Sequence, residues 1–418
     1  MTEQPLAGRF VRAGFDALPL VIYRGATGGV PILLGLFIAH RWGLSRLGAY
    51  TVANAIVGVG IVITDWGCAR WLPREFATAG RDDSLVAGPA NVARIGLSLA
   101  FALILVVLFA LGQIQRDSAG YVAILAPLWL ILAISTNGVS ARIVERDLRI
   151  VMVAVIIGLA VFLAGAILVL QSGGGPIAFV ATYVFAKLIE AFILVGRRAG
   201  LLVVRLAASL TTLRLLWPFS IQAILGAIYA RLSIFVVEHW GTRDQLNVLA
   251  GASVLQSVLL LLPTSLALLT YPPLSIAARN GDRPRMREMI TVYTVASAVG
   301  MAILVGILAA AIHPIGNLLH LPSSAMPFTV GFVAASVTTV GTTITGVLLQ
   351  ALGAERLGAR LSVITLSLAA VYQIVLFHMF GLTGVIAAMV ASEVTSLVIF
   401  GRASLTVIAA KVAGREAA

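Results

Sequence analysis

Apolar runs of about twenty residues recur along the whole chain, and they constrain its fold more than any other feature. A helix needs roughly 20 residues, at about 1.5 Å each, to cross a hydrocarbon core about 30 Å thick. With 60% hydrophobic and only 11% charged residues, the 418-residue chain has too little polar surface to cover a water-soluble fold. The sequence therefore predicts an all-α polytopic membrane protein.

The hydropathy pattern predicts about twelve transmembrane helices. Their expected ranges are 17–39, 47–69, 91–112, 121–141, 150–170, 177–196, 214–238, 246–269, 290–312, 325–349, 359–380 and 383–406. An even number of spans places both ends of the chain on the same side of the membrane. The polar, basic start is followed by no small-residue cleavage site, so we expect the first helix to remain as an anchor.

The distribution of positive charge predicts which side that is. Of the 29 Lys and Arg residues, 22 fall in the terminal segments and in the loops of one face. Cytoplasmic loops carry the excess of Lys and Arg, which predicts a bacterial cytoplasmic (inner) membrane protein with both termini in the cytoplasm. The net charge of +12 is then a topology signal, and we expect no nucleic-acid partner.

A basic stretch near the middle divides the chain into two halves. Residues 197–213 are too charged to span a membrane and are predicted to lie on the cytoplasmic surface as an amphipathic linker. The N-lobe, 1–196, then holds helices 1 to 6, and the C-lobe, 214–418, holds helices 7 to 12 and a short tail. The sequence following helix 1 resembles that following helix 7 at an offset of 198, which aligns Trp42 with Trp240 and suggests two duplicated six-helix lobes.

Apart from the loops, the terminal segments and the ends of the spans, three cations remain, namely Arg24, Lys187 and Arg231. A charge within the hydrocarbon costs about 2.5–3.5 kcal/mol on insertion scales, so each should face a cavity or a partner. We therefore take the three as candidates for substrate binding in a lumen. Arg231 is expected to share one helical face with Glu238.

Arg24 is the strongest of these candidates. It lies about seven residues inside helix 1, roughly 10 Å deep at about 1.5 Å per residue. Gly28, Gly29 and Pro31 follow it and predict a kinked or broken helix, which is tolerated in a membrane where it lines a cavity. The alternative is an arginine whose side chain reaches back to the headgroups.

Three acids complete the predicted set of functional residues. Asp65 lies at a depth close to that of Arg24 and is predicted to pair with it, or to be purely structural. Glu190 lies three residues after Lys187, so the two can neutralise each other. Glu393 can bind a coupling proton, or can form an interhelical hydrogen bond. Asp65, Glu190 and Glu393 are therefore the candidates for coupling or gating.

The motifs of soluble catalysis are missing from the sequence. It has no GxxxxGK[ST], HExxH, CxxC or DxD pattern, and Cys68 is the single cysteine. We predict no catalytic residue, no metal site and no cofactor. No loop of the face opposite the termini is long enough for a catalytic domain, which disfavours a membrane polymerase or glycosyltransferase.

Two stretches resemble a known family. The segment RWGLSRLGAYTVANAIVGVGIVITDWGCARWLPREFA, residues 41–77, is similar to the polysaccharide-transporter branch of the multidrug/oligosaccharidyl-lipid/polysaccharide (MOP) superfamily, with Gly43, Gly48, Tyr50, Asp65 and Gly67 at the pattern positions. The Trp42-Gly43 pair comes one residue earlier than the family pattern places it, and Leu44 stands where family members usually have proline. The chain from Pro218 to the LLPTSLALLTYPPLS stretch resembles helices 7 and 8 of that family, with Ser233 where many relatives carry an acid.

The resemblance implies a Wzx-type flippase. Such a protein moves undecaprenyl-pyrophosphate-linked oligosaccharide from the cytoplasmic to the periplasmic leaflet by alternating access, for surface polysaccharide such as O-antigen, capsule or exopolysaccharide. The implied partners are this lipid-linked oligosaccharide, membrane lipids and other polysaccharide-assembly proteins. Arg24 fits the picture because arginine offers planar, permanently charged donors to a pyrophosphate.

A second hypothesis from the same superfamily stays open. The drug-antiporter branch comprises proton- or cation-coupled exporters of small amphiphiles, which are expected to bear acids in the N-lobe. Here the N-lobe charges are balanced, with Arg24 and Lys187 against Asp65 and Glu190. Helix 1 carries a cation, which favours the flippase at this stage.

Overall fold

The computed structural model describes residues 26–78, 83–145, 147–206 and 209–412. Within these ranges all regular structure is helical, which confirms the predicted all-α membrane fold. Among the described residues, ten helices are long and apolar enough to cross a membrane, and a bent pair within residues 210–229 can form an eleventh. The first predicted span, 17–39, lies partly outside the described residues.

The helices pack into two compact units. Of the described residues, unit 1 contains 26–27 and those of 49–227, and unit 2 contains 28–48 and 228–412. The divisions after residues 27 and 227 fall near equivalent points of the two predicted repeats. The helical stretches that end at Trp42 and Trp240 also end 198 residues apart. The segment 28–48 thus packs with the second half of the chain, while 197–227 packs with the first.

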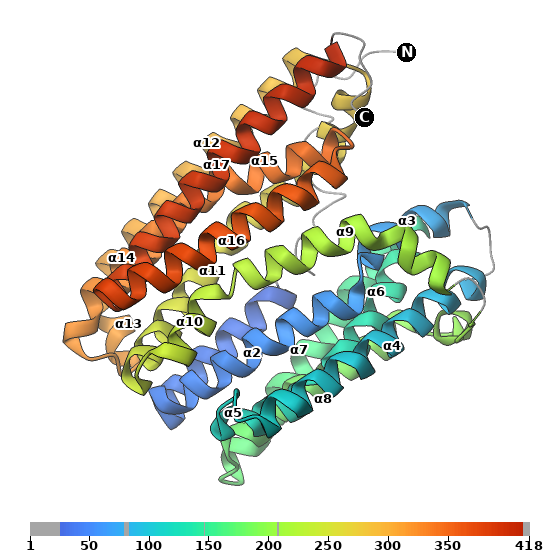
Figure 1. Cartoon of the computed structure of the whole chain (residues 1–418). Coiled ribbons are helices and arrows are strands. Elements are labelled where there is room, and N and C mark those ends of the chain that lie inside the picture. Colours follow the sequence, from blue (N-terminus) through green and yellow to red (C-terminus); the bar gives the residue numbers. More distant parts are fainter. Residues whose placement is uncertain (1–25, 79–82, 146, 207–208, 413–418) are drawn as a thin grey trace. The chain divides into compact units, whose positions relative to one another are not determined.

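Unit 1 is built mainly from seven α-helices and one 3₁₀ turn. They are α2 (Leu44–Asp65), α3 (Cys68–Thr78), α4 (Asp83–Ala110), α5 (Arg116–Leu125), α6 (Leu128–Glu145), α7 (Leu148–Gln171), α8 (Pro176–Val195) and η1 (Ala199–Leu202). The first part of α9 (Ser209–Tyr229) also belongs to this unit. Helices α7 and α8 run side by side, and α6 packs against both α8 and α3 (Figure 1).

A sharp corner separates α2 from α3. Trp66 and Gly67 adopt positive φ angles of 45° and 77°, which end the helix. Helix α3 then buries one face, formed by Cys68, Leu72 and Phe76, in a core shared with α4, α6 and η1. A residue such as Trp66 enters the left-handed region only at a cost, so the surrounding packing must hold this corner in place.

The predicted amphipathic linker takes a different form. Between residues 197 and 206 the only regular structure is the single turn η1. Leu201 is fully buried rather than lying on a membrane surface, and the backbone amide of Arg205 donates to the carbonyl of Gly88 in α4. This part of the segment is therefore mostly non-helical and is held against α4, while its position on the cytoplasmic surface stays a prediction.

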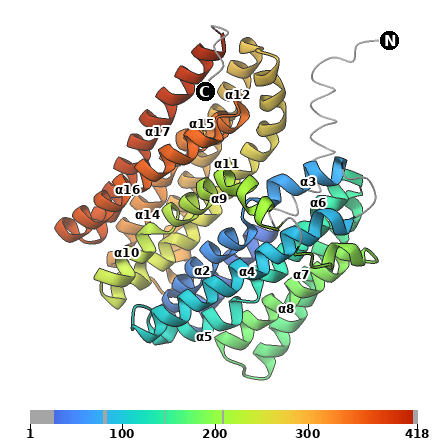
Figure 2. The ribbon, with the colours of Figure 1, turned by 45° about the vertical axis from the view of Figure 1, so that its right-hand side comes forward.

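Unit 2 comprises the helical residues 28–42 and the later helices of the chain. These are α10 (Leu232–Trp240), α11 (Arg243–Arg279), α12 (Arg283–Ala310), α13 (Ile312–Leu318), α14 (Met326–Ala335), α15 (Thr339–Ala351), α16 (Glu355–Phe380) and α17 (Leu382–Val412), with short 3₁₀ turns η2 (Ser323–Ala325) and η3 (Ser336–Thr338). Helices α16 and α17 lie side by side in both views (Figure 1 and Figure 2), and α15 packs on α17 and α11.

The stretch after Arg24 is a continuous helix over its described length. Residues 26–42 are helical without interruption, so no break is present at Gly28, Gly29 or Pro31. A Cβ atom at Gly28 would lie 2.9 Å from the Leu261 side chain. The small residue therefore lets this helix approach α11 closely, which is the common use of glycine between membrane helices.

Candidate functional site

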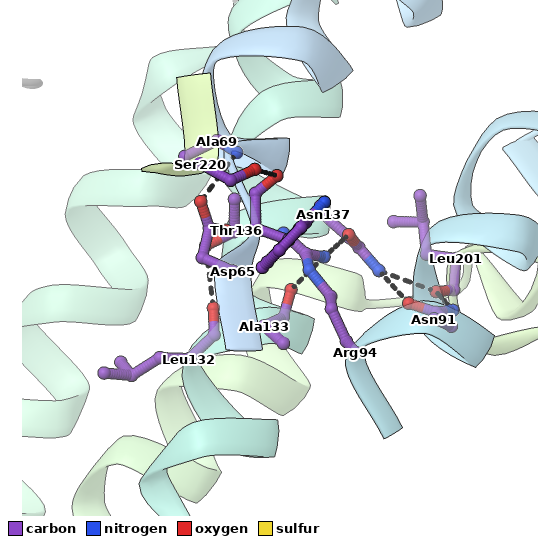
Figure 3. Close-up of polar contacts among 11 residues, drawn as sticks. Asp65, Ala69, Asn91, Arg94, Leu132, Ala133, Thr136, Asn137, Leu201 and Ser220 are labelled. Atoms are coloured by element: carbon purple, nitrogen blue, oxygen red, sulfur yellow. Dashed lines mark hydrogen bonds and ion pairs between the residues drawn. The ribbon is translucent and has the colours of Figure 1, made fainter. Parts of the chain in front are cut away.

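Asp65, the last residue of α2, forms a buried ion pair with Arg94 of α4. Arg94 Nη2 lies 2.7 Å from Asp65 Oδ1, and the Arg94 side chain is only 1% exposed. The other terminal nitrogen, Nη1, donates to Asn137 Oδ1 at 2.6 Å and to the Ala133 carbonyl at 3.1 Å (Figure 3). A carboxylate and two further acceptors thus hold the guanidinium, as a buried charge requires.

Two buried asparagines extend this pair into a network. Asn137 Nδ2 donates to Asn91 Oδ1 at 2.8 Å and to the Leu201 carbonyl at 3.1 Å. Asn91 Nδ2 donates in turn to the Leu201 carbonyl at 3.0 Å (Figure 3) and to the Val203 carbonyl at 2.9 Å. The asparagines therefore supply the hydrogen bonds that the non-helical segment after η1 cannot make to itself.

The network also reaches α9. Ser220 Oγ donates to the Trp66 carbonyl at 2.7 Å, and Trp66 Nε1 donates to the Leu213 carbonyl at 3.0 Å. Polar contacts thereby join the α2–α3 corner, α4, α6, the segment after η1 and α9 within unit 1. Buried hydrogen bonds of this kind rigidify the elements that they link.

Arg94 is a buried residue of this network that the sequence analysis did not single out, because it was counted among the loop cations. Helix α4 begins at Asp83, eight residues before the predicted start of its span, so Arg94 lies well inside the helix. Asn91, Arg94 and Ser98 recur at i, i+3 and i+7, which places them on one helical face. This stripe of polar residues on one helical face is a sequence signal that could have indicated the polar contacts of Arg94. Arg24, the predicted partner of Asp65, lies outside the described residues.

Lys187 and Glu190 of α8 form the second buried ion pair of unit 1. Lys187 Nζ lies 2.8 Å from Glu190 Oε2, with side chains 5% and 3% exposed. A Cβ atom at Gly158 of α7 would come 3.2 Å from Glu190 Oε2, so this glycine makes room for the carboxylate. The two charges therefore neutralise each other, as their three-residue spacing on one helix allows.

Arg231 lies where the predicted seventh span breaks. Helix α9 ends at Tyr229 and α10 begins at Leu232, and the Arg231 backbone carbonyl accepts from the amide of Phe235 at 3.2 Å. The prediction of one helix over 214–238 is therefore wrong. The break lies before Arg231, which caps α10, so Arg231 and Glu238 stay on the same helix while both are separated from α9.

Glu393 of α17 is a buried carboxyl in unit 2, with 3% exposure. The Thr342 hydroxyl of α15 donates to Glu393 Oε2. Tyr229 lies beside both Glu393 and Ser396. None of the ion pairs formed among the described residues involves Glu393. Its immediate surroundings are therefore hydroxyl groups.

Within the described ranges, no group of three or more His, Cys, Asp or Glu side chains is placed to hold a metal ion. The site residues predicted from sequence fall into separate places. Asp65 belongs to the network on α4 and α6, Lys187 and Glu190 pair on α8, and Glu393 lies in unit 2.

Comparison with solved structures identifies the fold. An inward-facing multidrug resistance MATE family transporter of the MOP superfamily matches with a TM-score of 0.70 and 14% identity, covering 93% of this chain and 98% of the other. An outward-facing structure of a MATE family transporter gives 0.64 and 14%, covering 98% and 99%. A eukaryotic MATE transporter gives 0.66 and 12%, covering 95% and 96%.

At this identity the likeness concerns the fold. The chain therefore has a MATE-like fold, which agrees with the superfamily suggested by residues 41–77 and does not single out its polysaccharide-transporter branch. No protein-family model matches the sequence, and no curated protein matches it either.

Proposed function

We propose that the protein is a membrane transporter that exports small amphiphilic molecules, neutral or cationic, in exchange for a proton or another cation. It works by alternating access in a cytoplasmic membrane, with both termini on the cytoplasmic side. The MATE-like fold supports this proposal, because two of the solved structures that share it are described as multidrug resistance transporters.

The observation that carries the proposal is the charge balance of unit 1. Arg94 and Lys187 are deeply buried, and each lies within 3 Å of an acid, at 2.7 Å from Asp65 and 2.8 Å from Glu190. Binding a pyrophosphate would require cations that are available to replace its water. Cations that already hold carboxylates would leave those acids buried and unpaired if they turned to a phosphate, which is costly.

Glu393 is the group to which we assign the coupling ion. A hydroxyl can donate to a carboxylate or accept from a carboxylic acid, so Thr342 and Tyr229 can serve both protonation states. An arginine or lysine partner would instead favour the charged state alone. The surroundings of Glu393 thus suit a carboxyl that gains and loses a proton during each transport cycle.

The second candidate is the lipid-linked oligosaccharide flippase. The family resemblance of residues 41–77 favours it, and so does Arg24 within helix 1. In this account Arg24 and Arg231 bind the pyrophosphate, and the protein serves O-antigen or other lipopolysaccharide or polysaccharide biosynthesis together with the assembly proteins.

Two assays run in parallel separate the candidates. The protein is expressed in bacteria that lack drug exporters of their own, and the cellular content of the lipophilic cation ethidium is measured. We expect the dye content to fall, and an uncoupler to abolish that effect. In the deletion strain, lipid-linked oligosaccharide should stay at its normal level. Accumulated oligosaccharide with lost surface polymer, and no change in dye content, would overturn the exporter.

A further inference from the structure

A pocket of about 1040 Å³ lies at one end of unit 1, where α6 and α8 end and α7 begins. Four arginines line it, namely Arg142, Arg149, Arg197 and Arg198, against the two acids Asp83 and Glu145. The lining therefore carries an excess of positive charge. None of these groups takes part in the proposed transport function.

Two of the arginines, Arg198 and Arg142, are held in place by contacts with acids. Arg198 makes a two-point contact with Asp83, with Nε 2.7 Å from Oδ2 and Nη2 2.6 Å from Oδ1. Glu145 Oε2 lies 3.0 Å from Arg198 Nη1 and 3.4 Å from Arg142 Nη1. A Cβ atom at Gly196 would lie 3.3 Å from Arg142 Nη2, so this glycine gives Arg142 its room.

The other two arginines supply the excess charge. Arg149 and Arg197 are exposed, and neither takes part in the ion pairs formed among the described residues. They extend from the start of α7 and from the end of α8, so they border the same pocket from two helices. Two guanidinium groups held beside one cavity can together bind a dianionic group.

An apolar wall adjoins these charges. Val144 and Val153 line the pocket and are 36% and 48% exposed, and Ile150 and Ile193 line it beside them. Exposed aliphatic side chains on a membrane-spanning helix such as α7 face lipid chains, while arginines at the helix ends lie at the level of the phosphates.

We propose that this pocket is a binding site for an anionic phospholipid, with Arg149 and Arg197 on its phosphates and its acyl chains along Val144 and Val153. Basic pockets between the ends of membrane helices bind lipids with clustered phosphates, and the pair of available arginines favours a lipid with two phosphates, such as cardiolipin. The pocket lies on one unit and holds its own charge excess, so the proposal is independent of the transported cargo.

The test measures lipid binding to the purified full-length protein in detergent, by native mass spectrometry and by the rise in melting temperature as lipid is added. The key variant is Arg149→Gln with Arg197→Gln. Its matched control is Arg283→Gln with Arg287→Gln, which removes two exposed arginines of α12 in unit 2. A second variant replaces Arg149 and Arg197 by Lys, which keeps the positive charge and removes only the planar guanidinium group with its paired N–H donors.

We expect cardiolipin to bind the wild type and the control equally, and the key variant about tenfold or more weakly. The Lys variant should bind cardiolipin with an affinity between that of the wild type and that of the key variant. Phosphatidylcholine should not bind the pocket, and inorganic pyrophosphate should bind more weakly than cardiolipin because it lacks acyl chains. Equal cardiolipin affinity of the key variant and its control would overturn the proposal, as would pyrophosphate binding as tight as that of the lipid. Glu393→Gln, which tests transport, should leave lipid binding unchanged.

Discussion

Unit 1 and unit 2 surround their buried charges with different chemistry. In unit 1, Arg94 and Lys187 lie 2.7 and 2.8 Å from the acids Asp65 and Glu190. In unit 2, the buried Glu393 accepts from the Thr342 hydroxyl and lies beside Tyr229. An opposite charge fixes one protonation state, whereas a hydroxyl can serve two. The contrast indicates that the unit 1 pairs hold structure, while the unit 2 carboxyl is able to change its charge.

The largest effect on stability should come from breaking the Asp65 and Arg94 pair. Arg94→Met removes one partner of a buried pair and leaves Asn137 without its donor, which should cost about 3–5 kcal/mol of stability. Thermal unfolding of the purified protein in detergent measures the loss. Arg356→Met, at an exposed arginine of α16, is the control and should change little. A stability equal to that of the control would show that the network is not structural.

Lys187 and Glu190 offer a test that removes both charges together. Either single substitution, Lys187→Met or Glu190→Gln, leaves an uncompensated buried charge and should cost about 3 kcal/mol. The double variant should recover most of that loss, since no buried charge remains. Wild-type transport by the double variant would confirm a structural role, whereas its complete loss with normal folding would assign the pair to the cargo site.

The hydroxyl next to Glu393 should contribute less to stability. Thr342→Val removes one interhelical hydrogen bond, which in membranes is worth roughly 0.6 kcal/mol and at most about 1.7 kcal/mol. Thr345→Val of the same helix is the control, because its hydroxyl bonds only backbone carbonyls. We expect Thr342→Val alone to slow proton-driven dye transport. Equal transport rates in the two variants would contradict a role for this hydroxyl.

The smallest effect concerns the thiol of Cys68, which reports on the α2–α3 corner without altering it. Burial raises its pKa to about 11, so very little thiolate is present at pH 7. A maleimide should therefore label the native protein slowly, and labelling should accelerate in Arg94→Met because the neighbouring network is broken. Rapid, complete labelling of the wild type would show that this corner opens readily.

The spans were predictable from sequence, but their ends and the polar contacts were not. Hydropathy located the apolar runs because each must cross the same thickness of hydrocarbon. It placed the start of α4 at residue 91 instead of Asp83, because Asp83, Ser84 and Pro89 lower the hydropathy and helix propensity of the first two turns, and it gave no reason to expect buried partners for Asn91 and Arg94. Their partners, Asn137 and the Leu201 carbonyl, lie far along the chain and are not visible from local pattern.

The breaks between helices were the other failure. Residues 227–240 contain neither proline nor glycine to indicate the end of α9 at Tyr229. The opposite error occurred at Gly28 and Pro31, where residues that often break helices lie in a continuous one. In both places the outcome depends on packing against neighbouring helices, which overrides local propensity.

The most direct test of the account is proton-driven transport by Glu393→Gln. The protein is reconstituted into vesicles, a pH gradient is imposed, and ethidium movement is followed by fluorescence. Glu288→Gln makes the same chemical change at an exposed position of α12 and is the matched control. We predict that the control transports at the wild-type rate and that Glu393→Gln, although folded, loses gradient-driven transport. Undiminished transport by Glu393→Gln would contradict the assignment of the coupling ion to unit 2.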